Sequence, residues 1–256
     1  MPFPRHVIIY LREKGIPQSL VAVVHVSDPQ LGNVAPPEYP FRPKGSLPIL
    51  AIPETELSGS VSYTYIRQSL AIMNYLDELC DAGHNDFPLS RYSMRGADAL
   101  SRARITEVVA LADECTTSWN LVRTFGSGAG TMSIPAASKE MMKRVRRPLN
   151  TIEGWWSDRD MSSLRQNGSG EVTMGDIVLY QFLEFTKDCY GVDMTQGSGE
   201  PVKDAYGRDV VEKYTKLGEF YDAFRTRESA RRDEAAGEVA SKEVLQRMMM
   251  WAPGSL

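Results

Sequence analysis

Strand-like segments stop early in this chain, and that asymmetry constrains the fold more than any other feature. Short runs rich in β-branched residues, "LVAVVHVS", "LPILAIPE" and "SYTYIR", all occur before residue 68. From residue 95 onward the apolar residues recur at helical spacing instead. The pattern predicts an α+β protein in which a small α/β unit precedes an all-helical unit.

The first unit is expected to span residues 1–82, followed by a polar linker at 83–94 that glycine and proline interrupt. Its elements should run in the order helix, buried strand, β-hairpin and helix. These four are expected at residues 4–15, 20–27, 47–67 and 69–80. Residues 28–46, rich in proline and glycine, should be mostly irregular. Ser69 is expected to cap the last helix, because a hydroxyl there accepts a bond from a free backbone N–H.

The second unit is expected to span residues 95–256 and to contain only helices and loops. Helices are predicted at 95–124, 135–160, 174–191, 208–232 and 242–256, with a kink at Pro148 and a loop at 193–207. The segment "EVTMGDIVL" predicts a capping box of Thr173 and Asp176, flanked by the apolar pair Val172 and Ile177. This motif concerns folding rather than chemistry.

Composition excludes several functional classes. The net charge of −4 argues against nucleic acid as the main partner, because phosphate binding needs a basic face. The longest apolar runs are far too short to span a membrane. Cys80, Cys115 and Cys189 lie far apart and, like the three histidines, show no metal-ligand spacing. The sequence therefore predicts reduced thiols, a cytoplasmic location and no metal.

Two short segments are candidates for ligand binding. In "GSLPIL", Pro48 belongs at a strand start, because proline donates no ladder hydrogen bond. A cis Leu47–Pro48 bond would present the backbone of Leu47 to an extended ligand, whereas a trans bond would simply open the strand. In "YIRQSLAIMNYL", Gln68 and Ser69 stand where a strand passes into a helix. A helix start with a hydroxyl binds a carboxylate well; the alternative is that Ser69 only caps its own helix.

Taken in order and spacing, "GSLPIL", "RQSLAIMNYLDE", "TMGDIVL" and "YTKLGEFYDAFRTRESARR" resemble the soluble glutathione transferase superfamily over nearly the whole chain. The Met-rich ending looks most like fungal members. The resemblance implies a thioredoxin-like domain followed by an all-α domain, with glutathione as co-substrate or cofactor. It implies that Gln68 and Ser69 hold the γ-glutamyl group and that Leu47 pairs with the cysteinyl unit, with Pro48 fixing the geometry. Lys44 would lie near the glycyl carboxylate.

The opening "MPFPRHVIIYLREKGIP" departs from the family pattern. Family members begin with a strand that ends at a Ser, Cys or Tyr acting on the glutathione sulfur, whereas here Met1 falls near that position. Three explanations stay open: the protein starts upstream, another segment or subunit completes the sheet, or the sheet is reduced and ordinary thiol chemistry is lost. Arg5 and His6 are either surface residues of the first helical turn or cationic groups that favour a thiolate.

The resemblance implies an enzyme that acts on a hydrophobic, electrophilic small molecule by conjugation or by glutathione-dependent isomerisation. The acceptor pocket is expected between the domains, with Trp119 and Arg123 as candidates, although the spacing of Trp119 also fits the core. One alternative is a tailoring enzyme of secondary metabolism, an isomerase, dehydratase or cyclase without thiolate chemistry. Another is a non-catalytic binding or scaffold protein. Family members usually pair, so a homodimer is expected.

Overall fold

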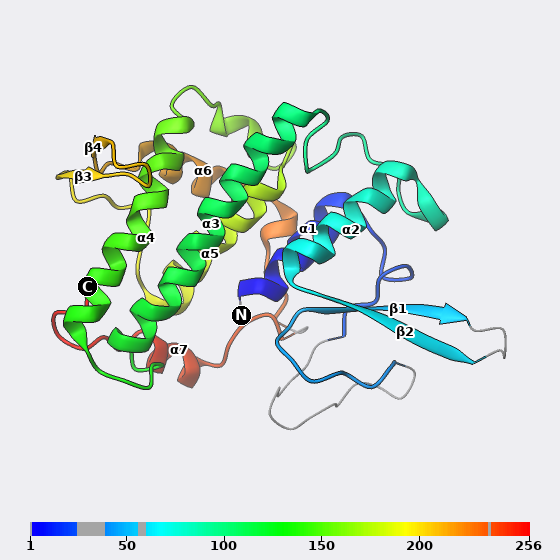
Figure 1. Cartoon of the computed structure of the whole chain (residues 1–256), viewed down its shortest axis with the longest axis horizontal. Helices are drawn as coiled ribbons and strands as arrows, with labels where there is room; N and C mark the ends of the chain where they lie inside the picture. Colours follow the sequence, from blue (N-terminus) through cyan, green and yellow to red (C-terminus); the bar gives the residue numbers. More distant parts are fainter. Residues whose placement is uncertain (1, 25–38, 56–59, 235–236) are drawn as a thin grey trace. The chain divides into compact units, whose positions relative to one another are not determined.

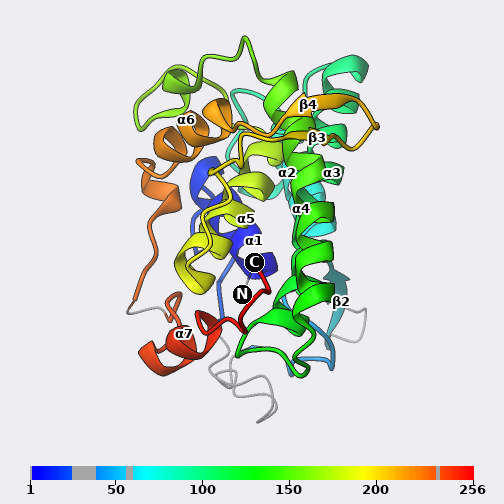
Figure 2. The same ribbon diagram turned by 90° about the vertical axis from the view of Figure 1, so that its left-hand side faces the viewer.

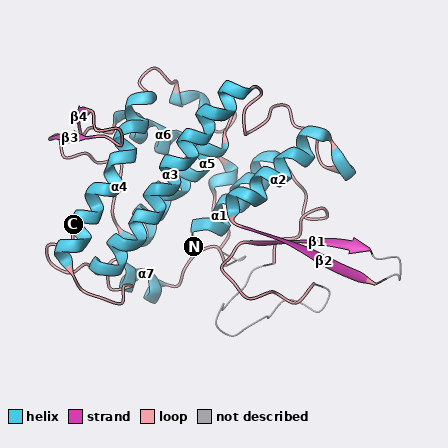
Figure 3. Cartoon of the chain, in the orientation of Figure 1, coloured by secondary structure: helices cyan, strands magenta, loops and turns pink. Residues whose placement is uncertain are grey.

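The computed structural model describes residues 2–24, 39–55, 60–234 and 237–256 (Figure 1). The chain forms two compact units. The first contains residues 3–93 together with 232–239, and the second contains residues 94–231 together with 240–256. Among the described residues, the strands form two short hairpins, and helices make up most of the rest (Figure 3).

The described part of the first unit contains two α-helices, a short 3-10 helix (His84–Asp86) and one antiparallel hairpin. The elements are α1 (Pro2–Lys14), β1 (Ile49–Thr55), β2 (Val61–Arg67) and α2 (Ser69–Ala82). In the hairpin, Ile49 lies opposite Arg67 and Thr55 lies opposite Val61. Both helices and the hairpin were expected from the sequence and are confirmed.

A buried carboxylate links the two helices of this unit. Asp77 of α2 is completely buried, and its Oδ1 lies 2.7 Å from Lys14 Nζ and accepts a bond of 3.0 Å from Tyr10 Oη. Ser93 Oγ donates to the other carboxylate oxygen at 3.1 Å. Around these groups lies an apolar core of Ile9, Ile72, Met73, Leu76 and Cys80. Burial, and then the Asp77 charge, raise the pKa of the Tyr10 phenol well above its ordinary value.

The buried strand predicted at residues 20–27 is absent from residues 20–24, the part of it that the structure describes. Residues 18–20 form a turn, residues 21–24 form no strand, and residues 25–27 lie outside the described residues. A β-branched run has high strand propensity, but a strand also needs a neighbour for its backbone groups. In the described part of this unit, β1 and β2 pair only with each other. The irregular segment expected at 28–46 is seen as such at 39–46, and the remainder lies outside the described residues.

The second unit is mostly helical, as expected (Figure 2). Its α-helices are α3 (Ala99–Gly126), α4 (Pro135–Trp155), α5 (Met174–Tyr190), α6 (Thr215–Phe224) and α7 (Lys242–Met248). The long helix α3 packs against α4 and α5. Almost every residue of α5 is buried, which fits its apolar character on most sides. Pro148 lies inside α4, which continues to Trp155.

Local capping signals fix where several of these helices begin. Thr173 Oγ1 accepts a bond from the Asp176 N–H at 3.2 Å, and an Asp176 carboxylate oxygen accepts one from the Thr173 N–H at 2.9 Å. The predicted capping box is thus confirmed, and Val172 and Ile177 beside it are fully buried.

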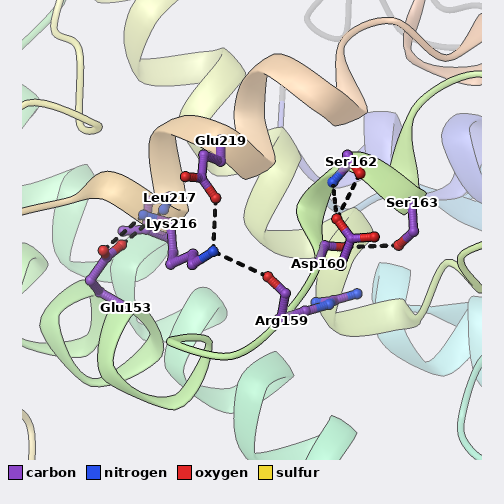
Figure 4. A network of polar contacts seen from close by, with 8 residues as sticks. All are labelled: Glu153, Arg159, Asp160, Ser162, Ser163, Lys216, Leu217 and Glu219. Carbon is purple, nitrogen blue, oxygen red and sulfur yellow. Dashed lines mark hydrogen bonds and ion pairs between the residues drawn. The ribbon is translucent and has the colours of Figure 1, made fainter.

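The start of α6 is capped by a residue distant in sequence. The Glu153 carboxylate accepts bonds of 2.8 Å from the N–H groups of Lys216 and Leu217 (Figure 4).

One element of this unit was missed. The loop predicted at 193–207 contains β3 (Pro201–Lys203), which pairs with β4 (Asp209–Val211) in a short hairpin. Residues 209–211, which fall in the helix predicted at 208–232, form the second of these strands, so that part of the prediction was wrong. The turn between the strands is held by Asp204, whose Oδ1 accepts from the N–H groups of Tyr206 and Arg208. Such Asp-centred turns override helix propensity over a few residues.

Candidate functional site

The hairpin register brings the two candidate binding segments to one end of the sheet. Because Ile49 lies opposite Arg67, the residues just before β1 and just after β2 are neighbours across the ladder. Leu47 and Pro48 precede β1, and Gln68 and Ser69 follow β2. All four belong to the first unit, so their proximity follows from one local pairing.

The backbone before β1 has an unusual form. The Leu47–Pro48 peptide bond is cis, and both residues are half-buried. Lys44 lies in the bend that leads to this bond, and its side chain is exposed. An exposed ammonium at this position is free to meet a solvent-facing carboxylate.

Gln68 holds a backbone conformation that non-glycine residues rarely adopt. Its φ of 72° and ψ of 123° place it in a sparsely populated region at the N-cap position of α2. Such conformations cost about 1–3 kcal/mol and cluster at ligand-binding and active sites. The side chain makes no capping bond and is exposed. The Gln68 amide does not cap α2 and is therefore accessible for hydrogen bonds to a ligand.

Ser69 differs from its sequence-based prediction. It is the first residue of α2 rather than its N-cap, so the capping role assigned to it was wrong. Its hydroxyl instead lies 3.1 Å from Nδ1 of His6, and both side chains are buried. The partner is 63 residues away in sequence, which is why local capping rules could not find it.

Arg5 is neither a surface residue nor a free cation. Its guanidinium donates to Glu238 Oε2 at 2.9 Å, and the side chains of both residues are almost fully buried. The same carboxylate contacts Arg12 through an ion pair of 2.5 Å. Glu238 comes from the late segment 232–239, which belongs to the first unit. No local sequence pattern points to Glu238, because its contact with Arg5 spans 233 positions.

Trp119 and Arg123 lie one turn apart on α3 in the second unit. Trp119 is completely buried, and its ring makes edge contacts with the rings of Phe182, Tyr190 and Trp251 at centroid distances of 5.4–6.5 Å. Arg123 is half-buried and donates from Nε to Asn120 Oδ1 at 3.0 Å. Burial raises the pKa of the Tyr190 phenol, while the nearby charge of Arg123 acts in the opposite direction.

All three cysteines are buried in this structure. None of Cys80, Cys115 and Cys189 forms a disulfide bond. Burial raises the pKa of the Cys80 thiol, although the Lys14 ammonium lowers it, and burial raises that of Cys115 well above its ordinary value. Within the described ranges, no group of three His, Cys, Asp or Glu side chains is arranged to hold a metal ion. Over the same ranges, no helix is both long and apolar enough to cross a membrane.

The N-terminal part of the chain resembles a known domain family. Residues 1–79 match the family model described as the glutathione S-transferase N-terminal domain. The fold is α+β, with a thioredoxin-like N-terminal domain of the glutathione transferase type and a mostly helical remainder. No curated protein matches the sequence.

Two solved structures share this fold. A glutathione S-transferase from Methylobacillus flagellatus, solved with glutathione bound, is 19% identical with a TM-score of 0.58; the alignment covers 90% of this chain and 93% of that one. A trimeric glutathione transferase from Leishmania is 16% identical with a TM-score of 0.51, over 90% of this chain. This chain spans only 43% of the Leishmania protein's length.

Proposed function

We propose that this protein is a glutathione-binding enzyme of the transferase type that acts on a hydrophobic, electrophilic small molecule. The observation that carries the proposal is Gln68. Its strained backbone stands directly before the buried start of α2 and opposite the Leu47–Pro48 segment. All of these residues fall inside the stretch that matches the transferase N-terminal domain.

The residues present fit glutathione, a peptide with a carboxylate at each end. The first N–H groups of α2 and the Ser69 hydroxyl suit the γ-glutamyl carboxylate, because a helix start favours an anion. The exposed Gln68 amide can orient the same group. The backbone of Leu47 suits the extended cysteinyl unit, as β-strand addition does for other peptides. Lys44 suits the glycyl carboxylate.

The reaction proposed is conjugation or glutathione-dependent isomerisation, with Arg123 contributing to acceptor binding. A glutathione-binding protein without thiolate activation is the second candidate, either a tailoring enzyme or a scaffold. One observation favours it: the Arg5 charge, which would promote a thiolate, is already balanced by Glu238. A homodimer, a fungal affiliation and a cytoplasmic location complete the proposal. Cysteines without disulfide bonds accord with the cytoplasmic location.

Calorimetric titration with glutathione tests the binding site. Replacing Gln68 with alanine should weaken binding about 10- to 100-fold, the range for a lost hydrogen bond to a charged group. The matched control is Gln18→Ala, because Gln18 is an exposed glutamine of the same unit that lies outside the site. Equal affinity in wild type and Gln68→Ala, or no binding by the wild type, would contradict the proposal.

A turnover assay separates the two candidates. Wild-type protein is mixed with glutathione and a chlorodinitrobenzene-type electrophile, and the conjugate is followed by absorbance. Turnover supports the transferase. Binding without turnover supports the second candidate.

A further inference from the structure

The buried histidine of α1 has a place in this site that neither the fold nor the family match assigns. His6 is fully buried, and its Nδ1 lies 3.1 Å from the hydroxyl oxygen of Ser69. We infer that His6 is a positioning residue: it donates from Nδ1 to Ser69 Oγ and so directs the Ser69 hydroxyl proton toward the γ-glutamyl carboxylate. This inference rests on the proposed function.

His6 contacts an aromatic ring as well as the Ser69 hydroxyl. Its ring meets the ring of Phe3 edge-on at a centroid distance of 5.9 Å. Ser69 is itself only 2% exposed. Burying a polar ring is costly unless it is hydrogen-bonded, so an apolar side chain would serve packing alone better. The buried contact between His6 and Ser69 therefore indicates that His6 does more than fill space in the core.

The direction of the hydrogen bond decides what Ser69 can bind. If Nδ1 accepts the hydroxyl proton, Ser69 Oγ offers only lone pairs, which suit an ammonium group. If Nδ1 carries a proton, Oγ accepts from it, and the hydroxyl proton is left for an anion. Ser69 is the first residue of α2, where the free N–H groups and the helix dipole favour negative charge. The helix start thus selects the donor state of His6.

Two substitutions separate positioning from packing. His6→Phe keeps an aromatic ring against Phe3 but removes Nδ1. His6→Asn keeps a donor close to the Nδ1 position. Each variant is titrated with glutathione and with an analogue in which the γ-glutamyl α-carboxylate is replaced by hydrogen. The same series is repeated in a Ser69→Ala background, and the thermal unfolding midpoint of each variant is recorded.

The expected result is specific to the carboxylate. His6→Phe should weaken glutathione binding about 10-fold, while His6→Asn should recover most of the loss. Affinity for the decarboxylated analogue should stay within about twofold, and His6→Phe should have no further effect in the Ser69→Ala background. Equal losses for both ligands, or no loss for either, would overturn the role of His6 while leaving the proposed function intact. A wild type that does not bind glutathione would overturn both.

Discussion

Asp77 is predicted to be a highly sensitive polar position of the first unit. The perturbation is Asp77→Asn, which keeps the shape of the side chain and removes its charge. Asp77 is 0% exposed and Lys14 only 5% exposed, so the ammonium would remain buried without its counter-ion. Lys14 would keep its bonds to Ser90 Oγ and the Tyr92 carbonyl oxygen, at 2.7 and 2.9 Å.

The size of the effect follows from these contacts. Removing one partner of a buried ion pair costs about 3–5 kcal/mol. The asparagine can still accept from Tyr10, and Lys14 keeps two oxygen partners, so the lower end, about 3 kcal/mol, is expected. Because Asp77 joins α2 to α1, the loss should appear as weaker protection of both helices.

The assay is urea unfolding followed by circular dichroism, with hydrogen exchange to locate the loss. The matched control is Glu140→Gln, which breaks the Lys143 pair, whose side chains are 67% and 60% exposed. An exposed pair contributes less than about 1 kcal/mol. Adding Lys14→Met to Asp77→Asn should restore part of the stability, because it removes the unpaired charge. If Asp77→Asn costs no more than the control, the reasoning about this buried pair is refuted.

Three further perturbations test other parts of the account. Thr173→Ala should lower the free energy of unfolding by about 1 kcal/mol through loss of the α5 cap, measured by urea unfolding; no change would contradict the cap. Burial raises the pKa of Asp204, but its bonds from Arg208 and Tyr206 outweigh this, so the net pKa lies below its ordinary value. Asp204 therefore stabilises the fold above an unfolded pKa of about 3.9, and this contribution is lost as pH falls through the lower folded value. Thermal midpoints of wild type and Asp204→Asn should accordingly converge in acid, and a constant gap would count against this. Glu238→Gln should lower the free energy of unfolding by about 3 kcal/mol and raise hydrogen exchange at residues 237–239, because it leaves the Arg5 charge buried without its counter-ion; unchanged exchange there would contradict this role of Glu238.

Local features of this fold could be predicted from the sequence, because their causes lie within a few residues. The capping box at Thr173 and the hairpin at 49–67 are of this kind. The strand expected at 20–27 failed over residues 20–24 because propensity cannot supply a pairing neighbour. The β3–β4 hairpin was missed because its strands have only three residues each.

In the candidate site, too, local motifs could be predicted and long-range contacts could not. Leu47, Pro48, Gln68 and Ser69 were selected by motif, and the hairpin register brings them to one end of the sheet. The hydrogen-bond partners of Ser69 and Arg5 could not be predicted from the sequence. Ser69 contacts His6, 63 positions away, and Arg5 contacts Glu238, 233 positions away. Contacts of that separation depend on tertiary structure, and neither a period nor a local motif encodes them.

A crystal structure of the protein with glutathione tests the central claim most directly. The account predicts the γ-glutamyl carboxylate within about 3 Å of Ser69 Oγ and of the first N–H groups of α2. It also predicts the cysteinyl backbone paired with Leu47 and the Gln68 amide on the γ-glutamyl group. Glutathione bound at another place, or a γ-glutamyl group that does not contact Gln68 and Ser69, would contradict it.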